Sequence, residues 1–226
     1  MSASDELEVE VDAIGVAIVD DHLMFAESLA RLLADEPDLR VVGVAGDADE
    51  AMALVADTHA RVVLLDYQLP GRDGVAVARD IKAAHPQCMV VMLTGTGDDR
   101  VLLAAIDAGC SGFITKDRAA LEVASAVRTA AAGEALISPA QLARLLPKLS
   151  RTHRAVGADL TERERELLAR LARGGTNKAI AEELHLSVNT VRNYVQSVLT
   201  KLGAHSKLEA VSTAVREGII DYPSGD

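Results

Sequence analysis

Residues 61–74 read RVVLLDYQLPGRDG, a short apolar run that ends in an aspartate and continues into a turn-rich segment. A strand that is apolar at every position is typical of a parallel sheet whose two faces are both buried. Pro70 and Gly71 are turn residues that separate this strand from the next element of the chain. We therefore predict a strand over residues 61–65, with Asp66 just past its carboxyl end.

Similar short runs lie on either side of this strand. They cover residues 13–19, 39–45, 89–93 and 112–114, and Ala/Leu-rich stretches of helical period separate them. Strands that alternate with helices favour a doubly wound α/β fold with a parallel sheet. Residues 13–135 are predicted to form one such domain around a five-stranded sheet.

The rest of the chain has a different pattern. Pro139 and Pro147 interrupt the alternation, and we interpret residues 136–158 as a linker. From residue 159 the β-branched runs disappear and four helical segments appear, over residues 161–173, 177–184, 188–202 and 207–217. Residues 159–226 are therefore predicted to form a small all-α domain.

Composition and charge limit the classes of protein to which the chain can belong. Apolar residues make up 49% of it, too many for a disordered chain, and the start of the chain is acidic where a secretion signal would be basic. No apolar run is long enough to span a membrane. Cys88 and Cys110 lack metal-ligand spacing, so we expect reduced, buried thiols in a cytoplasmic protein with no membrane partner.

The average charge of −11 hides an asymmetry between the two parts of the chain. Residues 1–140 hold 10 Lys and Arg against 24 Asp and Glu, whereas residues 141–226 hold 13 against 10. The second half of the chain is therefore mildly basic and the first half strongly acidic, which leaves nucleic-acid binding open for the second half.

Polar residues come after the predicted strands at the edge where open α/β sheets carry their functional groups. These residues are Asp20, Asp21, Asp66, Thr94 and Lys116. Carboxylates gathered at one edge repel one another, and a hard cation such as Mg²⁺ with oxygen ligands relieves that repulsion. A carboxylate beside Mg²⁺ can attack a phosphoryl donor to form an aspartyl phosphate. Strand-end aspartates that only cap helices are the alternative.

Residues 13–135 resemble the flavodoxin-like receiver domains of two-component response regulators. The resemblance lies in Asp20-Asp21, in Asp66 of LLDYQLPGRDG, in Thr94 of VMLTGTG and in Lys116 of GFITKD. It implies that Asp66 is the phosphoacceptor, that Mg²⁺ binds Asp20, Asp21, Asp66 and the backbone carbonyl of Gln68, and that Thr94 and Lys116 contact the phosphoryl group. It also implies a switch role for Phe113 together with Thr94. The family often has an arginine just after the acidic pair, which HLMFA at residues 22–26 lacks.

A helix-turn-helix is predicted in the second domain. Thr161 and Glu164 form a capping box for its first helix, and Ser187 is the expected N-cap of the helix over residues 188–202. That helix has one apolar face, made by Val191, Val195, Val198 and Leu202. Its opposite face carries residues suited to reading bases in a major groove, namely Asn189, Arg192, Asn193 and Gln196. Thr190, Tyr194 and Lys201 are candidates for phosphate contacts. A solvated polar face is the alternative.

Residues 160–215 closely resemble the LuxR-type helix-turn-helix domain, so the whole chain is similar to response regulators of the NarL/FixJ family. The resemblance implies that Lys178 contacts the DNA backbone and that residues 207–217 form a dimerisation helix through Leu208, Val211 and Val215. Members of the family often carry Lys or His where this chain has Gln196 and Tyr194. Its base preference therefore does not transfer.

These observations together predict a transcriptional regulator that a sensor histidine kinase phosphorylates on Asp66 and that then binds double-stranded promoter DNA as a homodimer. It would not be an enzyme beyond its own phosphorylation and dephosphorylation. One alternative is a phosphohydrolase with an aspartyl nucleophile, of the haloacid dehalogenase type, which Gln68 disfavours because that class carries an acid two residues after the nucleophile. A regulator or adaptor that works without phosphorylation is the other.

Overall fold

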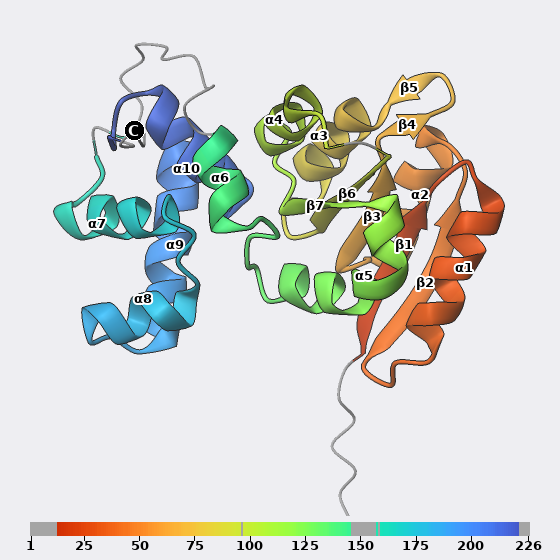
Figure 1. The fold of residues 1–226 in the computed structure, drawn as a ribbon, viewed down its shortest axis with the longest axis horizontal. Helices are drawn as coiled ribbons and strands as arrows, with labels where there is room; N and C mark the ends of the chain where they lie inside the picture. Colours follow the sequence, from red (N-terminus) through yellow and green to blue (C-terminus); the bar gives the residue numbers. More distant parts are fainter. Residues whose placement is uncertain (1–12, 96, 146–156, 158, 222–226) are drawn as a thin grey trace, which may run out of the picture.

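The computed structural model describes residues 13–95, 97–145, 157 and 159–221. They form two domains, an α/β domain and then a helical one (Figure 1). The predicted fold class is therefore confirmed for both. In the described part of the chain no helix is both long enough and apolar enough to cross a bilayer.

The first domain contains a five-stranded parallel sheet in the order β2-β1-β3-β6-β7. Its strands are β1 (Ile14–Val19), β2 (Leu39–Ala45), β3 (Val62–Asp66), β6 (Met89–Thr94) and β7 (Gly112–Thr115). All five predicted strands are present, and their bounds differ from the prediction by one residue at most. From β1 the chain continues to β2 on one side and later returns to β3 on the other side of β1. Open α/β sheets carry their functional groups at such a point, past the carboxyl ends of the two strands, here β1 and β3.

Helices cover both faces of this sheet. They are α1 (Leu23–Ala34), α2 (Ala48–Thr58), α3 (Gly74–Ala84), α4 (Asp99–Asp107) and α5 (Lys116–Ala131). Val16 and Ile18 of β1 pack with α1 and α5, whereas the alternating Ala17 and Val19 pack with α2, α3 and α4. Burial on both faces explains the nearly continuous apolar runs of β1, β3 and β6.

A small hairpin comes after the central strand. It consists of β4 (Gln68–Leu69) and β5 (Arg72–Asp73), and Gly71 turns it with a φ of +74°. At Gly74 a Cβ atom would lie 2.2 Å from the backbone carbonyl oxygen of Asp66. Only glycine permits this close approach, and the segment over residues 61–74 thereby holds the backbone of Asp66 in place.

The second domain consists of α7 (Glu162–Leu171), α8 (Asn177–Leu184), α9 (Val188–Leu202) and α10 (Lys207–Arg216). The predicted capping box of Thr161 and Glu164 is present, and Ser187 accepts a hydrogen bond from the backbone N–H of Thr190 at the start of α9. His185 ends α8 in the left-handed region with a φ of 54°. Helices α8 and α9 are the predicted helix-turn-helix.

The predicted linker contains a helix that the sequence analysis did not predict. Helix α6 (Pro139–Leu145) begins at the proline that interrupts the α/β pattern, because the first helical position needs no N–H donor. Leu142 and Leu145 are buried and anchor it. Residues 146–156 and 158 of the linker lie outside the described residues.

Candidate functional site

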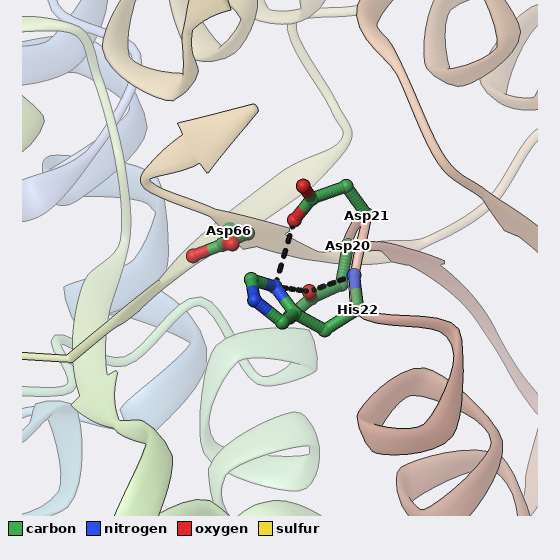
Figure 2. A group of neighbouring side chains, drawn as sticks. All are labelled: Asp20, Asp21, His22 and Asp66. Atoms are coloured by element: carbon green, nitrogen blue, oxygen red, sulfur yellow. Dashed lines mark hydrogen bonds and ion pairs between the residues drawn. The ribbon is translucent and has the colours of Figure 1, made fainter. Parts of the chain in front are cut away.

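Three carboxylates gather at the carboxyl ends of β1 and β3. Asp20 and Asp66 are buried, with 0% and 2% of their surface exposed, and Asp21 is exposed beside them. One possible ligand atom from each, together with one from His22, lies within 4.8 Å of the others (Figure 2). The structure thus brings together the acidic residues that the strand pattern placed at one edge.

Lys116 provides the counter-charge for this cluster. Its Nζ lies 2.7 Å from Oδ2 of Asp20 and donates a hydrogen bond to Oδ2 of Asp66 at 2.9 Å. The same Nζ lies 5.0 Å from the centre of the Phe25 ring. Because β7 ends where α5 begins, Lys116 reaches two carboxylates that lie 96 and 50 positions earlier in the chain.

Burial and neighbouring charges shift the pKa values of Asp66 and Lys116. Burial raises the pKa of Asp66, and the negative charge of Asp20 adds to the rise, while the hydrogen bond from Lys116 opposes it. Burial opposes the charged form of Lys116, but its hydrogen bonds to Asp20 and Asp66 outweigh this, and its pKa lies above the ordinary value. The site therefore favours additional positive charge.

The donor set suits Mg²⁺, which prefers carboxylate and carbonyl oxygens. Asp20, Asp21 and Asp66 offer such oxygens within one cluster. Gln68 begins β4 two residues after Asp66, next to the cluster along the chain. The role of its backbone carbonyl as a ligand stays a prediction.

His22 is a member of the cluster that sequence reasoning missed. Its Nδ1 lies 2.8 Å from Oδ1 of Asp21 and 3.3 Å from Oδ1 of Asp20, and its backbone N–H donates to Oδ1 of Asp20 (Figure 2). Asp20 thus orders the residue before α1, but no side chain of the described residues caps the N-terminus of this helix. The signal in the sequence was the position of His22 directly after the acidic pair.

Thr94 and Phe113 lie on the two strands beyond β3. Thr94 ends β6 and is buried, and Phe113 of β7 is buried in the apolar core. The position of Thr94 at the end of its strand agrees with the strand pattern, and Phe113 lies within β7, three residues before Lys116. Their switch role stays a prediction.

The predicted base-reading face of α9 is exposed. Val191, Val195, Val198 and Leu202 are buried, as predicted, while the base-reading candidates on the opposite face are accessible, namely Asn189, Arg192, Asn193 and Gln196. Lys178 is also exposed, and Thr190 and Tyr194 are partly so. Contacts of these residues with DNA stay predictions.

Lys201 differs from the other candidates for DNA contact because its positive charge is already paired with the carboxylate of Glu164. Its Nζ donates to Glu164 Oε2 at 2.7 Å, to Glu164 Oε1 at 3.0 Å and to the carbonyl oxygen of Asp159 at 3.2 Å. All three N–H donors of the ammonium group are used in this conformation. The structure thus gives Lys201 a role inside the domain that the sequence analysis did not predict.

The predicted dimerisation residues are buried within the chain. Leu208, Val211 and Val215 of α10 belong to an apolar cluster that continues into the first domain, where α10 packs against α4. Oδ1 of Asp107 at the end of α4 accepts hydrogen bonds from Oγ of Ser212 at 3.0 Å and from Nη1 of Arg216 at 3.1 Å. In this conformation α10 is covered by the first domain.

A cavity of about 150 Å³ also lies between the two domains. Arg192 and Gln196 of α9 line it from one side, and Glu134 and Ala135 line it from the other. Part of the predicted base-reading face is therefore turned toward the first domain.

Comparisons with known proteins agree with this architecture. Residues 16–128 match the response regulator receiver domain, and residues 158–214 match the bacterial regulatory proteins of the luxR family. The chain is 38% identical to the DNA-binding transcriptional activator DevR/DosR of Mycobacterium tuberculosis, over 87% of this chain and 92% of that protein.

Solved structures give the same picture. The Salmonella typhimurium response regulator RcsB is 25% identical, with a TM-score of 0.54 over 88% of this chain and 97% of that one. A structure of two RcsB dimers bound to two parallel DNAs is also 25% identical, with a TM-score of 0.54 over 90% of this chain and 98% of that one.

Proposed function

Because the chain belongs to the two-component response regulators that join a receiver domain to a LuxR-family DNA-binding domain, we propose that phosphorylation of Asp66 controls its binding to promoter DNA. That it is a DNA-binding transcriptional regulator follows from the family. The observation that carries the phosphorylation step is the buried carboxylate of Asp66 within hydrogen-bonding distance of Lys116 and beside Asp20.

In the first step, a carboxylate oxygen of Asp66 attacks the phosphorus of a phosphohistidine on a sensor kinase. An O–P bond forms, the N–P bond breaks, and the histidine leaves with its electron pair. Mg²⁺, when bound by Asp20, Asp21, Asp66 and the Gln68 carbonyl, would neutralise charge on the phosphoryl oxygens. Lys116, now paired with Asp66, would donate to one of these oxygens, and Thr94 to another.

The second step is a change in the contact between the domains. Thr94 and Phe113 lie on β6 and β7, which flank α4, and α4 holds α10 through Asp107. Rearrangement of this region on phosphorylation would favour a state in which α10 and the Arg192 face of α9 are free. Two chains would then pair through α10 and bind two half-sites of promoter DNA.

The test is to compare the wild-type chain with Asp66→Asn, which keeps the shape of the side chain but replaces the nucleophilic carboxylate by a neutral amide. A small acyl phosphate and Mg²⁺ should label the wild type to about one phosphate per chain and increase its affinity for promoter DNA captured from the genome. The Asp66→Asn variant should show neither effect. Labelling of the variant at the wild-type rate would overturn the assignment of Asp66.

The same experiment distinguishes the two alternatives. DNA affinity that is high and insensitive to labelling would indicate a regulator that works without phosphorylation. Sustained turnover of a phosphate ester, in place of one labelled aspartate, would indicate a phosphohydrolase. We expect neither result, and we place the protein in the cytoplasm, where its two free thiols, Cys88 and Cys110, would stay reduced.

A further inference from the structure

Glu134 lies just after α5 in the receiver, and its carboxylate reaches into the DNA-binding domain. Its Oε2 accepts a hydrogen bond from Nζ of Lys207 at 2.7 Å, and its Oε1 accepts one from the backbone N–H of Asn177 at 3.3 Å. Lys207 is the first residue of α10 and Asn177 is the first residue of α8. A single carboxylate therefore holds the starts of two helices of the other domain.

Glu134 accepts from a backbone N–H at the start of a helix and from a lysine ammonium group, and both kinds of donor commonly bind phosphate in proteins. A backbone N–H in the first turn of a helix carries partial positive charge and has no partner within the helix, and a lysine adds a full charge. Lys207 is only 6% exposed, and its burial lowers its pKa, an effect that Glu134 opposes and nearby Arg192 increases. Without an anion at this place, Lys207 and Arg192 would repel each other.

The position of this site is next to the base-reading face. Lys207 and Asn177 line the same interdomain cavity as Arg192 and Gln196. When α9 presents Arg192 to a base edge, the N–H of Asn177 and the ammonium group of Lys207 would therefore lie close to the DNA backbone. We call the conformation in which the receiver contacts the second domain the closed arrangement. It leaves the Oδ1 atom of Asn177, a residue that is 4% exposed, without a hydrogen-bond partner among the described residues. An unpaired buried oxygen costs free energy in this state, and opening removes that cost.

We propose that the backbone N–H of Asn177 and the ammonium group of Lys207 form a binding site for one DNA phosphate, which Glu134 occupies in the closed chain. The inference rests on the proposed function, because it requires α9 to read DNA. A carboxylate and a phosphodiester each bring one negative charge to the same donors, so only one of them can bind. Receiver and DNA backbone then compete for this site.

The first test is Glu134→Gln in the full, unphosphorylated chain. The amide keeps the size of the side chain but lacks the charge that competes with phosphate. DNA affinity should rise at least about fivefold, the lower end of typical coupling between two sites. The matched control is Glu122→Gln, an exposed carboxylate of α5 that pairs with Arg118 inside its own helix. An increase no greater than that of the control would overturn the proposal.

The second test places Lys207→Met in the Glu134→Gln background, with Lys207→Arg to retain the charge. Loss of the phosphate contact should lower DNA affinity and make its salt dependence shallower by roughly one unit, and the arginine variant should restore both. In the wild-type background the same Lys207→Met change should cost less affinity, because it also releases Glu134. Equal losses in the two backgrounds would overturn the competition.

The outcomes separate this inference from the proposed function. If Glu134→Gln matches its control but phosphorylated wild type still gains DNA affinity, the phosphate site is wrong and the proposed function stands. Circular dichroism and labelling of Asp66 would confirm that each variant is folded.

Discussion

At the scale of single residues, Lys116 connects the proposed phosphorylation site to the rest of the receiver. It pairs with both Asp20 and Asp66, and it begins α5, the helix that leads to Glu134. An aspartyl phosphate would carry more negative charge than the carboxylate it replaces, so Lys116 is the group in the described site best placed to respond to it.

We expect Lys116→Ala to permit some phosphorylation of Asp66 but to remove most of the resulting gain in DNA affinity, because the cation that contacts the phosphoryl group is lost. The measurement is DNA affinity before and after labelling. Arg118→Ala is the control, since this exposed residue of the same helix pairs only with Glu122 among the ion pairs of the described chain. A gain equal to that of the wild type would exclude Lys116 from the mechanism.

Arg192 allows a second prediction at this scale. It is exposed on the face of α9 opposite Val191 and Val195, and a guanidinium group can donate two hydrogen bonds to guanine. Arg192→Ala should cost about 1 to 3 kcal/mol on the best site and relax sequence preference. Binding to a set of single-base variants of that site would measure both. Unchanged preference would show that Arg192 does not read a base.

At the scale of elements, the pair of Glu164 and Lys201 joins α7 to α9. Burial alone would raise the pKa of Glu164, but hydrogen bonds from Lys201, Ser197 and Thr161 hold it at about 2. The ordinary value is 4.5, so the folded state favours the carboxylate more than the unfolded state does. The stabilisation is therefore complete above about pH 5 and is lost as the pH falls toward 2.

Lys201→Met should weaken this connection. We expect unfolding of the second domain to become easier by about 1 to 3 kcal/mol at neutral pH, because the buried carboxylate loses its main partner. The pH dependence between 5 and 2 should become shallower, since the pKa of Glu164 would return toward its ordinary value. Calorimetric unfolding across this range is the measurement, with exposed Lys178→Met as control. Parallel profiles for wild type and Lys201→Met would contradict the prediction.

At the scale of the whole molecule, the contact of α4 with α10 covers the predicted dimerisation face. Asp107 accepts hydrogen bonds from both Ser212 and Arg216, and Leu208 and Val211 are buried close by.

Asp107→Ala should therefore release α10 in the absence of phosphorylation. We expect self-association and affinity for DNA with two half-sites to increase about threefold to tenfold. This magnitude is modest because the bonds of Asp107 are partly exposed and stabilise only the state in which α10 is covered. Sedimentation, together with titration of DNA carrying one and two half-sites, would measure this. Asp80→Ala is the control, because Asp80 pairs with Arg72 inside the receiver. Equal affinity for one and two half-sites would contradict pairing through α10.

The sequence alone determined the strands, most of the helices and the acidic site. The five strands were recognisable as short, mostly apolar runs, and Asp20, Asp66, Thr94 and Lys116 were placed because each lies at the end of a strand or just after it. The starts of α7 and α9 were predicted because capping by Thr161 and Ser187 depends on neighbours three residues away. These patterns involve residues close together in the sequence, so they can be recognised without the tertiary structure.

Only the tertiary structure decided the roles of Lys201, Glu134 and α10. Lys201 looked available for DNA until the fold placed Glu164 beside it, 37 residues earlier in the chain. Glu134 and Lys207 are 73 residues apart, and Asp107 and Arg216 are 109 apart. Periodicity and capping contain no information on such pairs, because these contacts depend on how two folded domains meet. The docking of the two domains decided which charges pair.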